Sequence, residues 1–210
     1  MLMMIFLSSC NKHDFNYPAG TVGSSKIVSF PTVAINGSRL VIINQNGSFT
    51  DSGATATVNG AAVQYTTSGT VDASTPGVYM LTYSAQSTPP GYSSSDWRTV
   101  VVIGSDVSAN DFSGTYLRSA TGVTSTWTKT ASGVYTVENA GGATAGVGLE
   151  VIAVNYTGTK ITIPQQISSD YGGQVSSASE SYSLTPAPPT YSWIFFAPNY
   201  GTSLRTFVKQ

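Results

Sequence analysis

Charged side chains are scarce in this 210-residue chain, at 9% of its residues against about 25% in an ordinary soluble domain. Nine Lys and Arg residues face ten Asp and Glu residues, so the formal net charge is −1. Binding to nucleic acid requires clustered Lys and Arg side chains that neutralise phosphates, and no such cluster occurs. The composition therefore argues against a nucleic-acid partner.

Cysteine and histidine are almost missing. Cys10 and His13 are single occurrences, and both lie in the first thirteen residues. Zinc sites need several Cys and His ligands, and a nucleophilic triad usually needs a His base. We therefore expect no metal, no cofactor and no triad chemistry in the rest of the chain, and we expect His13 to be solvated. No apolar run long enough for a membrane-spanning helix follows the N-terminus.

The residues that are abundant favour strands and turns. Ser and Thr together number 57, Gly 21 and Tyr 12, whereas only three Glu and five Lys are available to build helices. β-Branched and aromatic residues suit a pleated, half-buried surface, and Gly, Ser, Asn and Pro supply turns. The composition predicts an all-β protein.

The first ten residues resemble an export and lipidation signal. A short apolar run ends in Leu7-Ser8-Ser9-Cys10, which is similar to the lipobox of bacterial lipoproteins. The resemblance implies a signal peptide over residues 1–9, short and without a basic start, and a lipidated Cys10 that anchors the protein to a membrane. Residues 10–25 lack periodicity and are predicted to be a flexible tether. The alternative is a lone thiol in a tail.

Residues 26–104 contain short strand-like runs separated by turn signals, at the spacing of a β-sandwich. Asn46-Gly47 and Asn59-Gly60 suit type I′ turns. The predicted strands cover 39–43, 54–58, 63–65, 78–85 and 97–103.

Two stretches in this region, DSGATA at 51–56 and VDASTPGVYMLTY at 71–83, resemble the bacterial surface Ig-like domain in order and spacing. The resemblance implies an immunoglobulin-like sandwich of seven strands without a disulfide, used as a spacer or adhesion module. In such sandwiches a tyrosine at the position of Tyr79 bonds back to the backbone of the preceding corner.

Three aspartates of this region are possible calcium ligands by residue type. Asp51, Asp72 and Asp96 lie far apart in the sequence, whereas calcium prefers clustered carboxylates. We expect them to cap turns instead. The insert at 89–96 is predicted to be an exposed loop between the last two strands, with Tyr92 and Trp97 as candidate ligand-binding residues, although loop elongation without function is the alternative.

Residues 105–210 are predicted to form a second antiparallel β-sandwich or β-barrel domain. The stretches FSGTYLR and GVYTVEN and the closing Trp193 and Phe207 resemble the uncharacterised C-terminal domain of two-domain outer-membrane lipoproteins from Gram-negative gut anaerobes. Many of those lipoproteins are encoded beside glycan-uptake systems. The predicted strands are 115–119, 125–130, 134–138, 147–154, 160–163, 181–184, 191–197 and 204–209.

Aromatic residues are the candidates for a sugar-binding surface, which needs flat rings and polar neighbours rather than titratable groups. Tyr171 precedes Gly172-Gly173-Gln174, and Tyr200 lies between Asn199 and Gly201. Trp127 and Trp193 fall within predicted strands, where they either line a cleft or pack in the core.

The sequence thus predicts a non-catalytic, lipid-anchored protein of the outer membrane, facing either the cell surface or the periplasm, that binds a polysaccharide or a component of an uptake complex. A structural or adhesive protein-binding module is the alternative. A glycosidase that uses paired carboxylates is the one enzyme class with candidate residues. Those candidates are Asp111, Glu138, Glu150, Asp170 and Glu180.

Overall fold

The structure, a computed structural model, describes residues 18–19, 21–22, 25–26, 28–88, 91–144 and 149–210. It confirms the all-β prediction, because the one helix among these residues is the short 3-10 turn Ser105–Val107 (η1). That turn is far too short to cross a membrane, and no described helix is long and apolar enough to do so. Cys10 and His13 lie outside the described residues.

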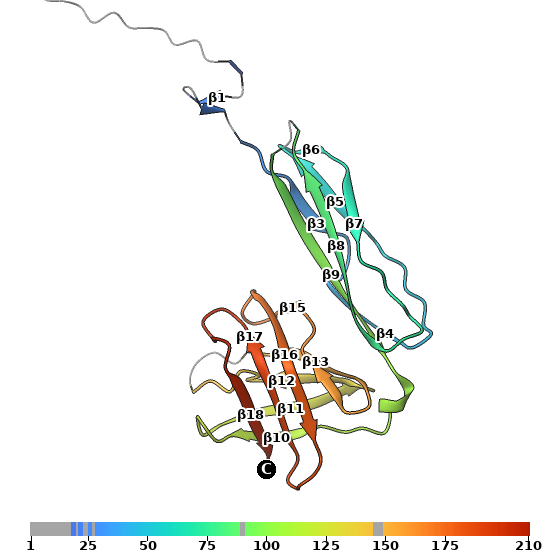
Figure 1. Cartoon of the computed structure of the whole chain (residues 1–210), viewed down its shortest axis with the longest axis vertical. Coiled ribbons are helices and arrows are strands. Elements are labelled where there is room, and N and C mark those ends of the chain that lie inside the picture. The colour runs from blue at the N-terminus through green and yellow to red at the C-terminus, as the bar shows by residue number, and fades with distance from the viewer. Residues whose placement is uncertain (1–17, 20, 23–24, 27, 89–90, 145–148) are drawn as a thin grey trace, which may run out of the picture.

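Strands before Gly104 form an immunoglobulin-like sandwich, preceded by a two-stranded ribbon of β1 (Thr21–Val22) and β2 (Ser25–Lys26). One sheet of the sandwich has the order β3-β5-β6 and the other β4-β9-β8-β7. Figure 1 shows the sandwich above the remaining strands. The bounds are β3 Thr32–Ile35, β4 Leu40–Asn44, β5 Ala54–Val58, β6 Ala61–Ala62, β7 Tyr65–Ser68, β8 Gly77–Gln86 and β9 Ser93–Ile103.

Two turn predictions have different outcomes. Asn59 and Gly60 join β5 to β6 with φ of 50° and 81°, which is the pair of positive angles that a type I′ turn needs. Asn46-Gly47 does not form a hairpin, because β4 pairs with β9 in parallel instead of with the following strand.

The loop between β8 and β9 is shorter than predicted. Gln86 pairs with Ser93, so Ser93 to Asp96 continue the β8–β9 ladder and do not belong to an exposed loop. Ser and Thr supply no apolar alternation from which this extension could be read.

The corner before β8 is held by two polar side chains. The Tyr79 hydroxyl donates to the Thr75 carbonyl oxygen at 2.7 Å, as the family resemblance implied. Asp72 accepts hydrogen bonds from the Ser74 amide at 2.9 Å and the Thr75 hydroxyl at 2.7 Å. Asp72 therefore caps a turn, as expected.

Arg98 is buried inside the sandwich, with 1% of its surface exposed. Its Nη1 forms an ion pair with Asp51, and its Nε donates to the Ser38 carbonyl at 3.0 Å. Asp51 also accepts from the Tyr83 hydroxyl at 2.6 Å and from the Gly53 amide at 3.2 Å. Asp51 thus caps a turn, as expected, and in addition neutralises a buried cation, which explains why the motif DSGATA begins with an acid.

Strands after Gly104 form one antiparallel sheet with the order β14-β13-β12-β11-β10-β18-β17-β16-β15. The sheet curls until its ends meet, where the Ser177 amide donates to the Ile163 carbonyl at 3.1 Å. The bounds are β10 Gly114–Arg118, β11 Val123–Ala131, β12 Val134–Glu138, β13 Val151–Thr157, β14 Lys160–Thr162, β15 Gln166–Ile167, β16 Gln174–Ser183, β17 Thr190–Phe196 and β18 Leu204–Lys209.

Two features of this sheet were not predicted. The short strand β15 was missed, and β16 begins at Gln174 and not at residue 181. Its register shifts between Ala178 and Ser181, where Ser179 has a φ of 54°, so the side-chain alternation is interrupted.

Aromatic side chains fill the interior of the curled sheet. Trp127 and Trp193 stack with ring centroids 5.5 Å apart, and Tyr191 stacks on Phe207 at 4.6 Å. Such rings contribute most of the buried area in a core of this kind. The other buried aromatic residues of this core are Phe112, Tyr116, Tyr135, Tyr182 and Phe195.

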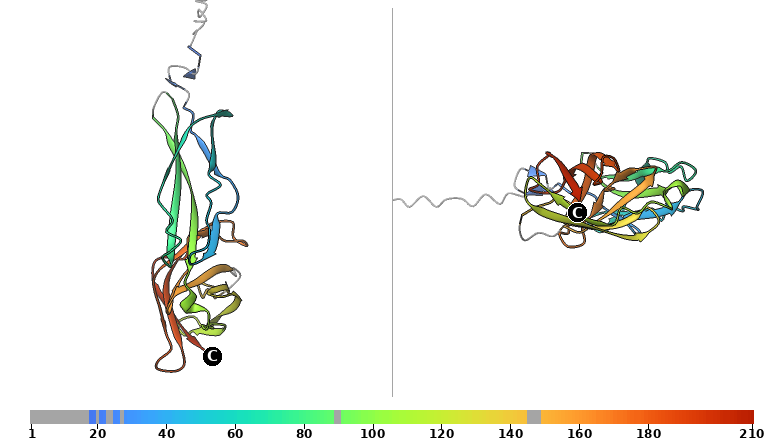
Figure 2. Two further views of the ribbon diagram at one scale, coloured as in Figure 1. Left: turned by 90° about the vertical axis from the view of Figure 1, so that its right-hand side faces the viewer. Right: turned by 90° about the horizontal axis from the view of Figure 1, so that it is seen from below.

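The sandwich and the curled sheet share an apolar cluster. Val101 and Ile103 of β9 pack with Val154 of β13 and with Val107 of η1, and all four are buried. The Gly104 amide also donates to the Tyr156 carbonyl at 2.8 Å. Figures 1 and 2 show the two parts stacked along the long axis.

We expect Asp51→Asn to lower the free energy of unfolding by about 2–3 kcal/mol, because it leaves a buried guanidinium without its counter-charge. Urea denaturation followed by tryptophan fluorescence measures this. Glu138→Gln, which removes an exposed carboxylate, is the matched control. Equal stability of the two variants would contradict the role given to the ion pair.

Candidate functional site

The candidate site lies where four connections meet at one end of the curled sheet. Because neighbouring strands of the sheet are antiparallel, β10, β12, β15 and β17 all end on this side. We call it the loop end. Its described connections are 119–122, 139–144, 168–173 and 197–203. Loops on a rigid scaffold are the usual place for binding residues.

The turn at 168–173 is tied down by its own hydrogen bonds. The Ser168 amide donates to the Gly173 carbonyl and the Gly172 amide donates to the Ser168 carbonyl, both at 2.9 Å. Gly172 has a φ of 70°, a conformation that favours glycine. The exposed side chain of Tyr171 is thereby carried on a fixed backbone.

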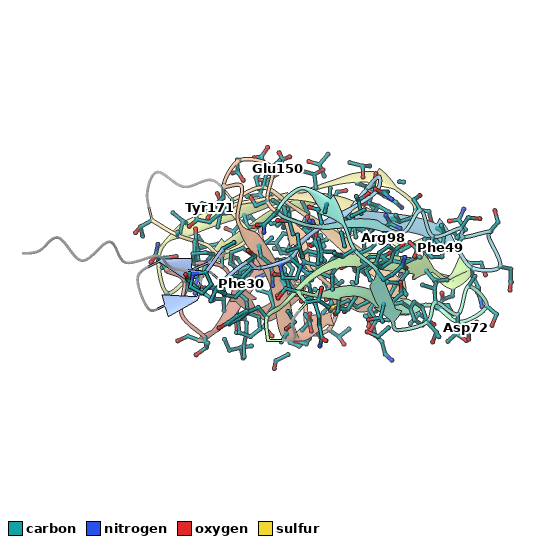
Figure 3. The ribbon with its side chains drawn as sticks, turned by 90° about the horizontal axis from the view of Figure 1, so that it is seen from above. Phe30, Phe49, Asp72, Arg98, Glu150 and Tyr171 are labelled. Carbon is teal, nitrogen blue, oxygen red and sulfur yellow. The ribbon has the colours of Figure 1, made fainter. Side chains whose placement is uncertain are left out.

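The Tyr171 ring lies against the turn that carries it, with one edge toward Gly173. A Cβ atom on Gly173 would collide with the Tyr171 ring, so the glycine makes room for this ring position. The side chain is 42% exposed. Figure 3 shows Tyr171 and Glu150 at the same margin of the molecule, far from Asp72. Part of the Tyr171 side chain is therefore open to solvent beside the turn.

An acidic pocket of about 450 Å³ adjoins this turn. Volumes of this size suit small-molecule ligands. Three of the five carboxylates that were glycosidase candidates, Glu138, Glu150 and Asp170, line it together with Asn139 and Ser169.

Both carboxylate oxygens of Asp170 accept hydrogen bonds that hold the turn at 168–173 in place. Its Oδ1 accepts from the Ser168 hydroxyl at 2.5 Å, and its Oδ2 accepts from the Glu150 amide at 3.1 Å. Burial by itself raises the pKa of Asp170, but these hydrogen bonds stabilise the carboxylate, and the net effect is a lowered pKa. A general acid for glycoside cleavage requires the opposite shift.

The other two acidic candidates lie outside this pocket. Glu180 accepts from the hydroxyls of Thr162 at 2.7 Å and Ser177 at 2.6 Å. Asp111 accepts from the Ser113 amide at 2.9 Å and caps a turn. Among the described residues no group of three His, Cys, Asp or Glu side chains is arranged to hold a metal ion.

Tyr200 lies between the acidic pocket and two arginines. Its ring packs edge-on against Phe195, with centroids 5.2 Å apart, and covers Gly141, where a Cβ atom would collide with it. Burial raises the pKa of its hydroxyl, the nearby charge of Arg205 lowers it, and that of Asp170 raises it. Tyr200 is therefore a half-buried wall residue, in contrast to the exposed Tyr171.

The two tryptophans proposed for the second part of the chain face the core. Trp127 is 1% exposed and Trp193 0%. The Trp193 indole N–H donates to the Ala140 carbonyl at 2.9 Å. Both are therefore removed from the ligand-binding candidates, because they point inward on their strands and pack against each other.

Tyr92 and Trp97 lie in the sandwich, away from the loop end. Tyr92 packs on Phe30 with ring centroids 4.7 Å apart, and the Arg39 guanidinium lies 4.6 Å from the centre of the Trp97 indole. Arg39 is also paired with Asp96. The expectation that Asp96 caps a turn is therefore wrong, because it lies within β9 and neutralises an arginine. The structure does not bring these candidates together with Tyr171 and Tyr200.

A polar groove of about 800 Å³ lies on the sandwich. Hydroxyl and amide side chains line most of it, and neither Tyr92 nor Trp97 does. Its residues are Val63, Gln64, Thr66, Ser84, Ala85, Gln86, Thr88, Ser93, Ser94 and Ser95.

Sequence reasoning missed Arg118 and Arg205, which line a second pocket at the loop end, of about 380 Å³. A signal was present in the side-chain alternation. Arg205 shares the inward face of β18 with Phe207, and Arg118 shares that of β10 with Tyr116. An arginine at an inward position is rare enough to indicate a special role.

One known protein family matches the sandwich. Residues 33–102, from β3 to β9, match the model of the family described as bacterial surface protein, Ig-like domain. The resemblance drawn from the motifs at 51–56 and 71–83 is thereby confirmed for this part of the chain. A bacterial surface domain indicates a location in the cell envelope.

Two solved structures are similar to the chain. The lipoprotein BT2262 from Bacteroides thetaiotaomicron is 20% identical, with a TM-score of 0.38, over 86% of this chain and 100% of that one. The M60 catalytic domain with the CBM51-1 and CBM51-2 domains from Clostridium perfringens ZmpB is 13% identical, with a TM-score of 0.31, over 72% of this chain and 14% of that one. Both likenesses are too weak to carry an argument. No curated protein matches the chain.

Because the pKa of Asp170 is lowered in the folded protein, its hydrogen bonds persist at neutral pH and are lost only as the pH falls through that lowered value, below about 3.9. We expect the amide NMR signal of Glu150 to report this titration between pH 7 and 2. Asp170→Asn should abolish the transition. A midpoint at or above the ordinary Asp value would contradict the assignment.

Proposed function

We propose that this protein is a non-catalytic cell-envelope protein, anchored to the outer membrane through a lipid on Cys10, that binds a glycan at the loop end of its curled sheet. The exposed ring of Tyr171 on a hydrogen-bonded turn, beside the acidic pocket, is the observation that carries the proposal.

Sugar rings stack on flat aromatic faces, and their hydroxyl groups bond to amides and carboxylates. The loop end offers both. Tyr171 supplies the face, and Asn139, Glu138 and Glu150 supply polar groups in the adjoining pocket. A ring that is already held in position loses little conformational entropy when it binds, which favours affinity.

The lowered pKa of Asp170 supports binding over catalysis, since a carboxylate that stays ionised and occupied by hydrogen bonds is a poor proton donor. In this proposal the sandwich acts as a spacer between the anchor and the loop end.

We expect Tyr171→Ala to weaken glycan binding at least about tenfold, the factor that corresponds to 1.4 kcal/mol. Isothermal titration of the full chain against a panel of soluble neutral and acidic polysaccharides measures this. Tyr92→Ala is the matched control, because it removes an exposed tyrosine from the sandwich.

Three outcomes would count against the glycan proposal. If Tyr171→Ala binds the glycan as tightly as the unaltered chain does, the binding site lies elsewhere. Release of reducing ends from a bound polysaccharide would show a glycosidase. The absence of binding to every polysaccharide would favour the structural or adhesive protein-binding module.

The anchor has its own test. Expressed in a Gram-negative host, the full chain should partition into the detergent phase of Triton X-114, whereas Cys10→Ala should stay in the aqueous phase because it cannot accept acyl chains. Recovery of both forms from the aqueous phase would refute lipidation at Cys10.

A further inference from the structure

We propose that the pocket formed by Arg118 and Arg205 is an anion subsite that takes the carboxylate or sulfate group of an acidic sugar. The inference rests on the proposed glycan-binding function and specifies the chemical class of the glycan.

The first observation is that Arg205 is a buried cation bonded only to neutral groups. It is 5% exposed. Its Nη1 donates to the carbonyl oxygens of Phe195 at 3.4 Å and Ser203 at 3.2 Å, and its Nη2 donates to that of Tyr200. Its Nε is buried and has no hydrogen-bond partner among the described residues. Burying a charge without a counter-charge is costly.

A second cation, Arg118, lines the same pocket from the neighbouring strand β10. Arg118 donates through Nη1 to the Gly142 carbonyl at 3.0 Å, and its other hydrogen bond in the described part of the chain, to Gly141, also uses Nη1. Its Nη2 and Nε therefore keep donors for a ligand. Burial lowers the pKa of Arg205, and the neighbouring positive charge of Arg118 lowers it further.

The other two arginines of the chain differ from Arg118 and Arg205 because each has a carboxylate partner. The other buried arginine, Arg98, is neutralised by Asp51, and the half-buried Arg39 is neutralised by Asp96. These are the two ion pairs found among the described residues, and both lie in the sandwich. Arg118 and Arg205 form none there, so the counter-charge of this pocket is left for a ligand to supply.

The surroundings suit a sugar that carries the anion. Thr121, Thr144, Asn199 and Tyr200 also line the pocket, so hydroxyl and amide groups surround the two guanidinium groups. Planar guanidinium groups match carboxylate and sulfate oxygens in pairs.

The acidic pocket is the neighbour of this one. Asn139 lines the acidic pocket, and its Oδ1 accepts from the amide of Ala143, which lines the basic pocket, at 3.0 Å. The turn at 139–143 is thus a wall common to both. A glycan with one charged and one neutral sugar would place its anion beside the arginines and its hydroxyls beside the carboxylates.

The test is isothermal titration of the full chain with polygalacturonate, dextran sulfate and uncharged dextran. We expect at least one acidic polymer to bind more tightly than dextran, and we expect salt to weaken that binding. Binding of polygalacturonate alone assigns a carboxylate, and binding of dextran sulfate alone assigns a sulfate.

Variants locate the binding. Arg118→Gln should weaken the binding of the acidic polymer at least about tenfold, and Arg118→Lys should weaken it less because one charge remains. Lys160→Gln is the matched control, since it removes one exposed positive charge from the opposite end of the sheet. The Nε–H NMR signal of Arg205 should shift on addition of galacturonate or sulfate.

Several results would overturn the anion subsite. The first is that Arg118→Gln binds the acidic polymers as tightly as the unaltered chain does. The second is that Lys160→Gln loses as much affinity as Arg118→Gln. The third is that the Nε–H signal of Arg205 does not shift. If a neutral glycan binds through Tyr171 while Arg118→Gln has no effect, the proposed function stands and the subsite fails. If acidic polymers depend on Arg118 but not on Tyr171, the subsite stands and the binding face proposed above is wrong.

Discussion

Strands β9 and β13 pack against each other, so each is buried on both of its faces. One face of β9 closes the sandwich. The other face carries Val101 and Ile103, which pack on Val154 of β13. The opposite face of β13 lines the core of the curled sheet. The Thr99 hydroxyl adds a bond to the Gln165 carbonyl at 2.7 Å. Strands buried on both faces become almost continuously apolar, as VVVI at the end of β9 is. This contact sets the direction of the loop end relative to the sandwich.

Charge is scarce in this chain, and its few arginines are therefore informative. Arg98 replaces apolar packing by a closed network of Asp51, Tyr83 and backbone carbonyls. Arg205 occupies an equivalent inward position on its strand, but its hydrogen bonds to the described residues go to backbone carbonyl oxygens and to no carboxylate. The first arrangement holds two strands and a loop of the sandwich together. The second leaves a positive charge without a carboxylate partner among the described residues, beside the pocket that Arg205 lines with Arg118.

Much of the fold could be predicted from the sequence where apolar and polar residues alternate. β5 and β12 were predicted to the residue, and the family motifs of the sandwich identified Tyr79 and Asp72 with their roles. Prediction failed where strands are rich in Ser, as in β16 and the start of β9, because pairing with a neighbour and not hydrophobic alternation extends them. For the site, turn chemistry singled out Tyr171, whereas the two arginines come from strands that are far apart in the sequence and become neighbours only because β10 pairs with β18.

The parallel pairing of β4 with β9 has a mechanical consequence. Leu40 lies opposite Thr99 and Asn44 opposite Ile103, and the chain enters the sandwich ahead of β4 and leaves it after β9. A pull between those two ends draws the strands past each other along their length. Their hydrogen bonds then share the load in shear and do not open one after another, so the sandwich is built to resist tension along its length.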